Sequence, residues 1–284
     1  MGKNKKNKRL KIAAIILAVF FIAIFVLCLI FIDNKNIKYE YFTINSNSHE
    51  TGTEVKIVHL SDLHFPKIKA DIDKMLQKIE NEKPDIIAIT GDIIDNGSSA
   101  GLQGAFTFIE KLKDIAPAFY VKGNHEVKSY ETSSILNNKL TENGIKVLNN
   151  ESVNISIKGA GITIIGLADN ADYDPKYLDG NLDAETNYKI LLAHRPEKWL
   201  NYTSAANSIK PNLILAGHAH GGQFRFFGKG VAAPDQGLFP KYAGGLYKTK
   251  DEQTYMVVSR GIGNSIFPFR FNNKPHIPVI TINL

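Results

Sequence analysis

The chain has 284 residues and carries 34 Lys and Arg against 28 Asp and Glu. Six of the basic residues lie before position 12, and the rest of the chain is formally neutral. Proteins that bind nucleic acid carry a basic face on their folded domain, so we expect no nucleic-acid partner. The single cysteine, Cys28, excludes an internal disulfide and a metal site built on several cysteines.

An uncharged apolar run extends over residues 12–32. A membrane-spanning helix needs about 20 apolar residues, whereas the apolar part of a cleavable signal peptide has about 7–15. The run ends in Asp33-Asn34-Lys35, which offers no small-residue cleavage site. We therefore interpret it as an uncleaved transmembrane anchor; the alternative is a long signal peptide. Because positive charge stays on the cytoplasmic side, the basic tail 1–11 is expected in the cytoplasm and the folded part of this cell-membrane protein outside it.

Residues 33–53 are polar and rich in Asn and Ser, which predicts a stalk with an edge strand at 39–44. From 54 to 284 no linker-like stretch or internal repeat interrupts the chain, so we expect one folded domain. Apolar runs predict strands and helical spacing predicts helices. The expected strands are 55–60, 85–90, 118–121, 153–157, 162–167, 190–193, 213–216, 256–259 and 279–284, and the expected helices are 70–81, 103–115 and 133–143.

This alternation predicts an α/β fold, and the strand-rich second half predicts a mixed sheet or two sheets packed face to face. Five of the strands lead directly into polar motifs, and ligands of open α/β sheets gather at the carboxyl ends of strands. The motifs are Asp62-Leu63-His64, Gly91-Asp92-Ile93-Ile94-Asp95, Gly123-Asn124-His125-Glu126, Ala193-His194-Arg195-Pro196 and Gly217-His218-Ala219-His220.

The side chains in these motifs are those of a metal centre. Carboxylates and imidazoles without thiolates suit Mn, Fe or Zn. Alternate residues of an extended strand share a face, so Asp62 and His64 are expected to point to the same side, as are His218 and His220. Glycines beside the ligands allow the backbone to approach the metals closely.

In this order, the five motifs resemble the calcineurin-like metallophosphoesterase superfamily, from Val55 to the C-terminus. The stretches 190–197, 217–223, 237–247 and 260–281 are similar to a membrane-associated bacterial branch, often described as similar to UDP-2,3-diacylglucosamine pyrophosphohydrolases. The resemblance implies a β-sandwich of mixed sheets flanked by helices.

The resemblance also implies two divalent metal ions. Asp62, His64 and His220 would hold one, Asn124, His194 and His218 the other, and Asp92 would bridge both. Two dications about 3.5–4 Å apart clamp the attacking and leaving oxygens of the reaction, and a bridging water becomes a hydroxide nucleophile near neutral pH.

His125 would not bind metal, according to the resemblance. It would donate a proton to the leaving oxygen or neutralise charge in the transition state, oriented by Asp95 or Glu126. In purple acid phosphatases a metal-bound tyrosine occupies the position of Asp95. We therefore predict no strong visible absorption band in the metal-loaded protein, and such a band in the spectrum would contradict this.

Other residues have open interpretations. His59 is expected to pack inside or at an edge, and His49 and His276 at the surface. Arg195, Arg225 and Arg260 fit either a phosphate contact or a surface salt bridge. A late group of aromatic residues is expected to pack in the second sheet; the alternative is an apolar surface near the metals that accepts a lipid tail or touches the bilayer. The group comprises Phe224, Phe226, Phe227, Phe239, Tyr242, Tyr247, Phe267, Phe269 and Phe271.

The sequence thus predicts metal-dependent hydrolysis of a phosphoester or diphosphate bond. The leading substrate is a phosphate-containing, lipid-linked molecule, such as a nucleotide-sugar-lipid diphosphate. One alternative is a phosphodiesterase or phosphatase acting on soluble nucleotides or wall polymers. The other is a catalytically silent binding module, which the complete set of ligands disfavours.

Overall fold

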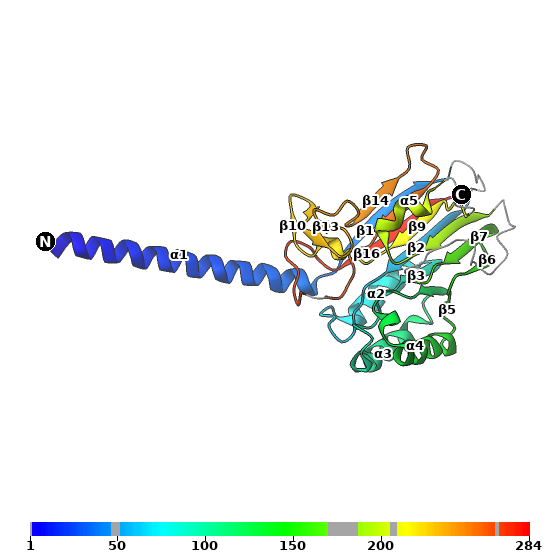
Figure 1. Ribbon diagram of the computed structural model, residues 1–284, viewed down its shortest axis with the longest axis horizontal. Helices are drawn as coiled ribbons and strands as arrows, with labels where there is room; N and C mark the ends of the chain where they lie inside the picture. The colour runs from blue at the N-terminus through cyan, green and yellow to red at the C-terminus, as the bar shows by residue number, and fades with distance from the viewer. Residues whose placement is uncertain (1, 47–51, 170–186, 205–208, 265–266) are drawn as a thin grey trace.

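The computed structural model describes the chain except residues 1, 47–51, 170–186, 205–208 and 265–266. Two six-stranded mixed sheets pack face to face, helices cover the outside, and one long helix projects from an end of the domain (Figure 1). The predicted sandwich of mixed sheets flanked by helices is confirmed. His49 lies outside the described residues.

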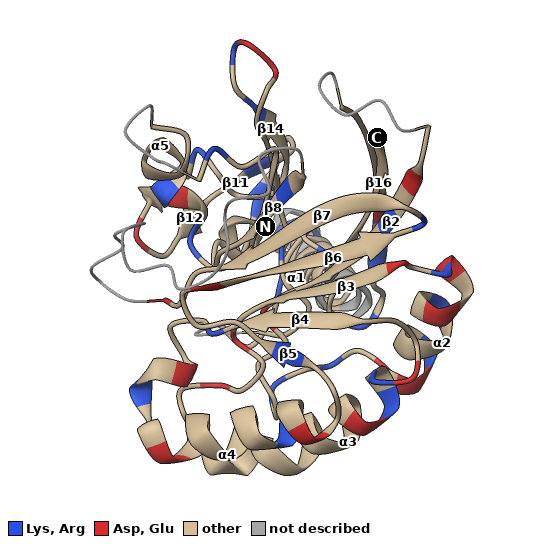
Figure 2. Cartoon of the chain, turned by 90° about the vertical axis from the view of Figure 1, so that its right-hand side faces the viewer, with Lys and Arg blue, Asp and Glu red and all other residues tan. Residues whose placement is uncertain are grey.

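The first sheet has the order β1-β16-β2-β3-β4-β5. Its strands are β1 (Lys38–Asn45), β16 (His276–Asn283), β2 (Glu54–Leu60), β3 (Ile86–Thr90), β4 (Ala118–Val121) and β5 (Lys146–Val147). Three amphipathic helices cover its outer face, and their charged residues are exposed or half-buried, while β3 and β4 carry no charge (Figure 2). They are α2 (Ile72–Glu82), α3 (Leu102–Leu112) and α4 (Tyr130–Glu142).

The second sheet has the order β14-β15-β9-β8-β7-β6. Its strands are β14 (Gly245–Lys248), β15 (Tyr255–Val258), β9 (Leu213–Ala216), β8 (Tyr188–Leu192), β7 (Ala160–Gly166) and β6 (Glu151–Ile157). Ile, Leu and Val side chains from both sheets fill the layer between them. Two small hairpins not expected from the sequence lie between β9 and β14: β10 (Arg225–Phe226) with β11 (Lys229–Gly230), and β12 (Ala232–Ala233) with β13 (Gly237–Leu238).

The expected packing of the late aromatic group is correct only in part. Tyr242 is buried against Trp199 of the short helix α5 (Trp199–Tyr202), and Tyr247 packs on the same core. The phenylalanines behave differently, because several of them lie on the hairpins and loops outside the sheet. Exposed members are Phe226, Phe227, Phe239 and Phe267.

The strand directions bring the polar motifs to one end of the domain. Strands β2, β3 and β4 run parallel, as do β8 and β9, so each group ends at a common edge. Strands β3, β4 and β9 are apolar along nearly their whole length because they are covered on both faces. All five motifs follow the carboxyl ends of these strands.

The N-terminal helix α1 (Gly2–Lys35) leaves the domain at that same end. Its residues Leu10–Leu27 have a mean hydropathy of 3.0, and by length and composition they could cross a membrane. β1 pairs in parallel with β16, with Lys38 opposite His276, while β2 runs antiparallel to β16, with Val58 opposite Val279. The start of β1 and the end of β2 therefore lie at the same edge. The sheet thus begins inside the predicted stalk, before residue 54.

His276 was expected at the surface, and this is wrong. It is fully buried at the start of β16, which the edge strand β1 covers. Its Nδ1 accepts the Arg260 N–H (3.1 Å), and its Nε2 lies 3.0 Å from Glu40 Oε2. Arg260 Nη1 also donates to Glu40 (2.9 Å). A buried imidazole is tolerated here because Nδ1 is hydrogen-bonded and Nε2 faces the Glu40 carboxylate. His59 is buried as expected, 2.8 Å from Thr90 Oγ1.

Replacing Glu40 with Gln is expected to destabilise the domain in a pH-dependent way. Hydrogen bonds from His276 and Arg260 hold the pKa of Glu40 well below its usual range. This stabilisation is therefore fully present above the unfolded-state pKa of about 4.3 and is lost progressively as the pH falls from there towards the much lower folded-state pKa. At pH 7 the variant should lose about 1.5–3 kcal/mol of unfolding free energy.

Thermal unfolding of the detergent-solubilised full chain between pH 3 and pH 8 measures this effect. Glu80→Gln, at an exposed position of α2, is the matched control and should change little. A Glu40→Gln deficit that is the same size at pH 3 as at pH 7 would contradict the assigned role.

Candidate metal centre

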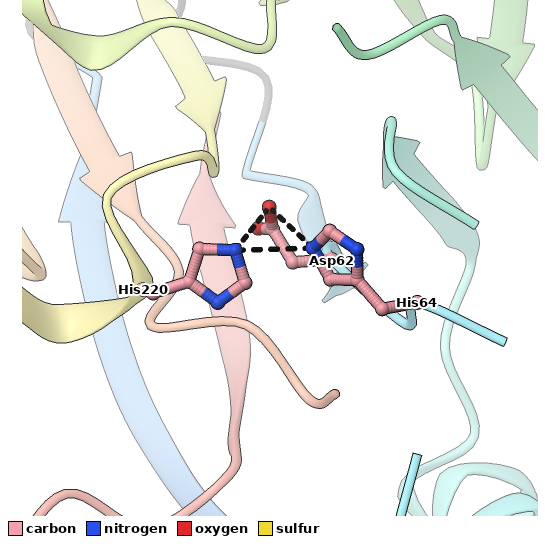
Figure 3. A group of neighbouring side chains, drawn as sticks. All are labelled: Asp62, His64 and His220. Atoms are coloured by element: carbon pink, nitrogen blue, oxygen red, sulfur yellow. Dashed lines mark hydrogen bonds and ion pairs between the residues drawn. The ribbon is translucent and has the colours of Figure 1, made fainter. Parts of the chain in front are cut away.

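Asp62, His64 and His220 form the first group of converging ligands (Figure 3). His64 Nε2 lies 3.0 Å from His220 Nε2, and Asp62 Oδ1 lies 3.8 Å and 3.4 Å from these two nitrogens. All three side chains are buried. Two imidazole nitrogens and a carboxylate oxygen facing one point are a donor set that suits a divalent transition metal.

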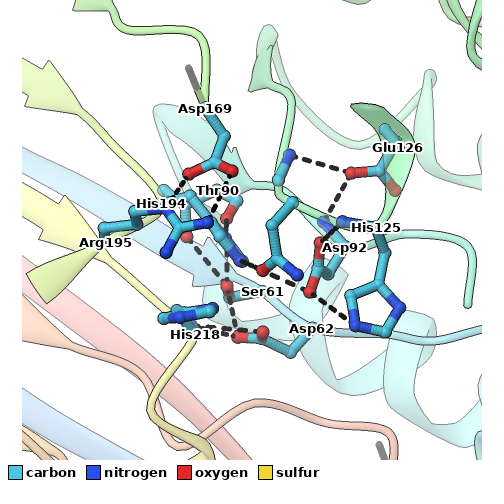
Figure 4. A network of polar contacts seen from close by, with 12 residues as sticks. Ser61, Asp62, Thr90, Asp92, His125, Glu126, Asp169, His194, Arg195 and His218 are labelled. Atoms are coloured by element: carbon cyan, nitrogen blue, oxygen red, sulfur yellow. Dashed lines mark hydrogen bonds and ion pairs between the residues drawn. The ribbon is translucent and has the colours of Figure 1, made fainter. Parts of the chain in front are cut away.

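Asp92, His194 and His218 form a second group (Figure 4), and Asn124 lies against its His194. His194 Nε2 lies 3.0 Å from Asn124 Oδ1 and 3.3 Å from Asp92 Oδ2. Asp92, His194 and His218 could hold one ion between them, and the Asn124 oxygen lies beside it. The structure thus brings together all seven ligands that the sequence suggested.

Asp92 lies between the two groups. Its Oδ2 is 3.3 Å from His194 Nε2 and 3.6 Å from His64 Nε2, so a single carboxylate oxygen faces both groups. Its other oxygen, Oδ1, accepts the His125 N–H (2.8 Å). A Cβ at residue 123 would lie 2.2 Å from Asp92 Oδ1, so only glycine fits there. This is the position that a bridging ligand requires.

Five of the seven ligands have a left-handed backbone. Positive φ is uncommon outside glycine, and such strain is concentrated at functional sites. The ligands converge, but not through the extended strand geometry expected from residue alternation. The chain turns sharply after each strand and directs successive side chains inward. The residues are Asp62, His64, Asp92, His218 and His220, with φ from 48° to 63°.

Neighbouring acceptors fix the orientation of three histidine rings. His194 Nδ1 lies 2.7 Å from the Thr90 carbonyl oxygen, and His64 Nδ1 lies 3.2 Å from Asp95 Oδ1. His218 Nε2 lies 2.9 Å from Asp235 Oδ2. Each ring can donate one N–H to its acceptor, which leaves the lone pair of the other nitrogen for a metal.

Nearby carboxylates raise the pKa of two of the buried histidines. Burial alone lowers the pKa of His194, but Asp92 raises it to about 10. For the same reasons the pKa of His64 is raised to about 9, by Asp62, Asp95 and Asp92. A bound cation would take the place of these protons, so metal binding releases protons.

His125 stands beside the ligands without belonging to either group. Its Nδ1 accepts the Asn96 N–H (2.6 Å) and lies 3.3 Å from Asp95 Oδ1, and its Nε2 lies 3.8 Å from Asp92 Oδ2. Burial lowers the pKa of His125 to about 4, so the ring is neutral at pH 7. Because the Asn96 N–H occupies Nδ1, the ring proton is on Nε2, on the side of Asp92.

Glu126 has a role that the sequence did not suggest. Its buried carboxylate accepts backbone N–H groups of Asp92 (2.8 Å), Ile94 (3.1 Å) and Gly123 (2.8 Å). It therefore joins the loops after β3 and β4, and its carboxylate is directed at these groups rather than at the His125 ring (Figure 4). Burial, with the nearby Asp92 charge, raises the pKa of Glu126 to about 7. Of the two candidates for orienting His125, Asp95 lies beside the ring.

Glu126→Gln is expected to weaken metal binding about 10–100-fold, the usual effect of losing support behind a ligand. The amide NH₂ cannot accept the N–H groups that one carboxylate oxygen now binds, so the Asp92 loop should shift. Calorimetric titration of the chelator-treated full chain with Mn²⁺ measures the affinity. Glu142→Gln, at an exposed position of α4, is the matched control. Equal affinities of wild type and Glu126→Gln would contradict the role.

The three arginines left open by the sequence all have partners within the protein. Arg195 forms ion pairs with Asp169 (Figure 4) and with Asp235. Arg260 binds Glu40, and Arg225 Nη1 donates to the Gly221 carbonyl. Through Asp235, Arg195 supports His218 instead of facing the substrate side.

A pocket of about 320 Å³ opens over the two groups. Its basic residues include Lys67 and Lys128, which the sequence did not single out. Lys67 Nζ lies 2.7 Å from Asp95 Oδ2, and Lys128 Nζ donates to Asn96 Oδ1 (2.8 Å). Their only signal in the sequence is that each lies three residues after a functional histidine.

One further side chain reaches the first group from the C-terminal segment. The fully buried Arg270 has Nη2 3.3 Å from His220 Nδ1 and donates to the carbonyl oxygens of Arg260 (2.7 Å) and Gly263 (2.5 Å). The loop before the last strand thus contributes to the wall of the centre.

Comparison with known proteins agrees with this geometry. The sequence model of the family described as calcineurin-like phosphoesterase matches residues 55–222. YkuE, an uncharacterized metallophosphoesterase of Bacillus subtilis, is 33% identical over 80% of this chain and 78% of its own length. An uncharacterized metallophosphoesterase of Aquifex aeolicus is 29% identical over 92% of this chain and 98% of its own length. A transmembrane protein with a metallophosphoesterase domain from Bos taurus is 32% identical, over 78% of this chain and 52% of that protein. The chain therefore belongs to the calcineurin-like phosphoesterase family and is a metallophosphoesterase.

Proposed function

We propose that this protein hydrolyses a phosphoester or diphosphate bond of a lipid-linked substrate at the outer surface of the cell membrane. Asp62, His64 and His220 would hold one divalent ion (Mn, Fe or Zn), and Asn124, His194 and His218 the other, with Asp92 shared. When bound, two such ions supply charge stabilisation and activate water for in-line displacement. No serine or cysteine nucleophile is needed.

His125 acts in this proposal as a hydrogen-bond donor. Its neutral ring has the proton on Nε2, next to Asp92 and at the wall of the pocket. A neutral imidazole can still stabilise the oxygen on which negative charge develops. The Asn96 N–H holds the ring on its other side.

The observation that carries the lipid-linked substrate is the position of α1. The helix leaves the domain at the edge where the ligand-bearing strands end (Figure 1), so the candidate centre lies at the end of the domain that a membrane-spanning α1 would hold next to the bilayer. The basic residues before the apolar segment support a cytoplasmic N-terminus and a catalytic domain outside the cytoplasm. A substrate that stays in the membrane suits a centre placed there.

A panel of phosphate compounds tests the substrate class. The full chain, reconstituted in vesicles and loaded with Mn²⁺, is given a lipid-linked diphosphate in the same vesicles, a soluble nucleotide diphosphate, a soluble phosphodiester and a phosphorylated wall polymer. We expect the highest kcat/KM for the lipid-linked compound. Equal turnover of lipid-linked and soluble diphosphates would reject it, and preference for a nucleotide or a wall polymer would favour the alternative.

A further inference from the structure

Large apolar side chains are exposed at the end of the domain from which α1 leaves. Phe227 is fully exposed (102%), and Phe239 is 75% exposed. With three others they form what we call the apolar rim. Soluble domains rarely expose apolar patches of this kind without a partner. The rim comprises Phe226, Phe227, Leu238, Phe239 and Phe267.

The rim is formed by segments far apart in the sequence. Phe226 lies on the β10–β11 hairpin and Phe267 on the loop before β16, and Figure 1 shows both segments around the end of α1. Aromatic contacts join them, because Phe226 packs on Phe271 (ring centroids 5.7 Å apart) and Phe267 packs on Phe224 (5.4 Å). The hairpin and the loop therefore present one aromatic surface.

The last turn of α1 is fixed to the same loop. Asn34 is buried, and its Oδ1 accepts the Arg270 N–H (3.0 Å) and an N–H of the Asn264 side chain (3.1 Å). Its Nδ2 donates to the Arg270 carbonyl (3.2 Å). The apolar run ends at residue 32, only about 3 Å along the helix axis from Asn34. If α1 spans the bilayer, this loop lies at the membrane surface.

Charge on the other side of α1 fits an anionic surface. A groove of about 520 Å³ beside the helix end is lined by four lysines and by Asp71. Lys74 lies 3.5 Å from Asp71 and Lys78 lies 2.6 Å from Glu82, so acidic partners within the protein offset part of this positive charge. Lysines at a membrane boundary interact with anionic headgroups, and aromatic side chains occupy the interfacial layer. The lysines are Lys35, Lys69, Lys74 and Lys78.

We propose that the apolar rim inserts into the outer leaflet of the bilayer that α1 crosses. The domain then has two attachments, the helix and the rim, and the metal centre faces the lipid surface at a fixed height. This proposal rests on the membrane placement proposed above, but it does not depend on which phosphate compound is the substrate.

Tryptophan probes in the full chain test the insertion. Phe227→Trp and Phe239→Trp variants are reconstituted in vesicles of phosphatidylcholine and phosphatidylglycerol, with or without bromine on the acyl chains. Bromine quenches only tryptophans that reach the acyl region, so the fluorescence added by each probe should be roughly halved. The native Trp199 is buried in the domain. Its fluorescence, measured in the wild type, is subtracted from that of each variant.

Lys250→Trp is the matched control, because Lys250 is exposed on the β14–β15 hairpin at the far end of the domain (Figure 1). Its fluorescence should be the same in both kinds of vesicle. Turnover of a soluble aryl phosphodiester shows that each variant is folded. If the two rim probes behave like the control in folded protein, the proposal is wrong. If the probe fluorescence changes with protein concentration but not with bromine, the rim instead contacts a second copy of the chain.

The two proposals can fail separately. Quenching at the rim combined with equal turnover of lipid-linked and soluble diphosphates would keep the docking surface and reject the substrate. The opposite result would keep the substrate and reject the surface.

Discussion

Asp92→Asn is expected to lower kcat for a soluble aryl phosphodiester by about a thousandfold or more, since the paired ions supply several kcal/mol of transition-state stabilisation. Asp92 Oδ2 faces both ligand groups, at 3.3 Å from His194 Nε2 and 3.6 Å from His64 Nε2. Negative charge between two dications offsets their repulsion, and an amide supplies none. The variant should therefore also bind fewer ions.

The measurement combines steady-state kinetics of the full chain with its metal content by mass spectrometry. Asp73→Asn makes the same chemical change at an exposed position of α2 and should leave both unchanged. Thermal unfolding shows whether each variant is folded. Wild-type turnover by folded Asp92→Asn would reject the mechanism, and wild-type protein without metal-dependent turnover would favour a silent binding module.

His125→Ala is expected to lower kcat about 10²–10⁴-fold while leaving metal content unchanged, because His125 lies beside the ligands rather than among them. The loss should be larger for an alkyl leaving group, which needs more stabilisation, than for p-nitrophenolate. His125→Gln keeps an N–H donor of similar reach and should recover part of the rate. Loss of metal from His125→Ala would instead make His125 a ligand.

The pH dependence of the hydrolysis rate tests whether His125 acts as a neutral ring. Burial lowers the pKa of His125 to about 4, so the ring stays neutral from pH 5 to pH 8 and its donated hydrogen bond does not change over that range. Wild type and His125→Ala should therefore have profiles of the same shape. If the wild-type rate falls above about pH 6.5, the usual pKa of histidine, while the rate of His125→Ala does not, the ring acts as a cation.

The residues that could be predicted are those whose surroundings are local in sequence. Asp62 and Asp92 each follow a short apolar run that the layers bury on both sides, so the strand and the motif at its end are readable together. The edge strand β1 was also predictable, from the alternation at Tyr39–Ile44. The family resemblance then grouped the ligands, which single motifs could not do.

What escaped prediction depends on contacts between distant segments. His276 is polar in sequence, but it is buried by Glu40 and Arg260, which lie on other elements. Glu126 follows His125 directly, yet its partners include the N–H groups of Asp92 and Ile94 from another loop. The exposed phenylalanines on hairpins such as β10–β11 are of a residue type that usually fills a core. Residue type alone does not distinguish a core from an exposed apolar surface.

The hydrogen bonds of Asn34 make the last turn of α1 part of the folded domain. Asn34 belongs to α1, but it holds the backbone of Arg270, and the guanidinium of Arg270 lies 3.3 Å from His220. A domain separated from α1 at the end of the helix therefore loses support two steps away from a candidate metal ligand. Any soluble form intended to keep the native centre has to begin before Asn34. For the same reason, proteolytic release at this point would separate the enzyme from part of its own active-site wall.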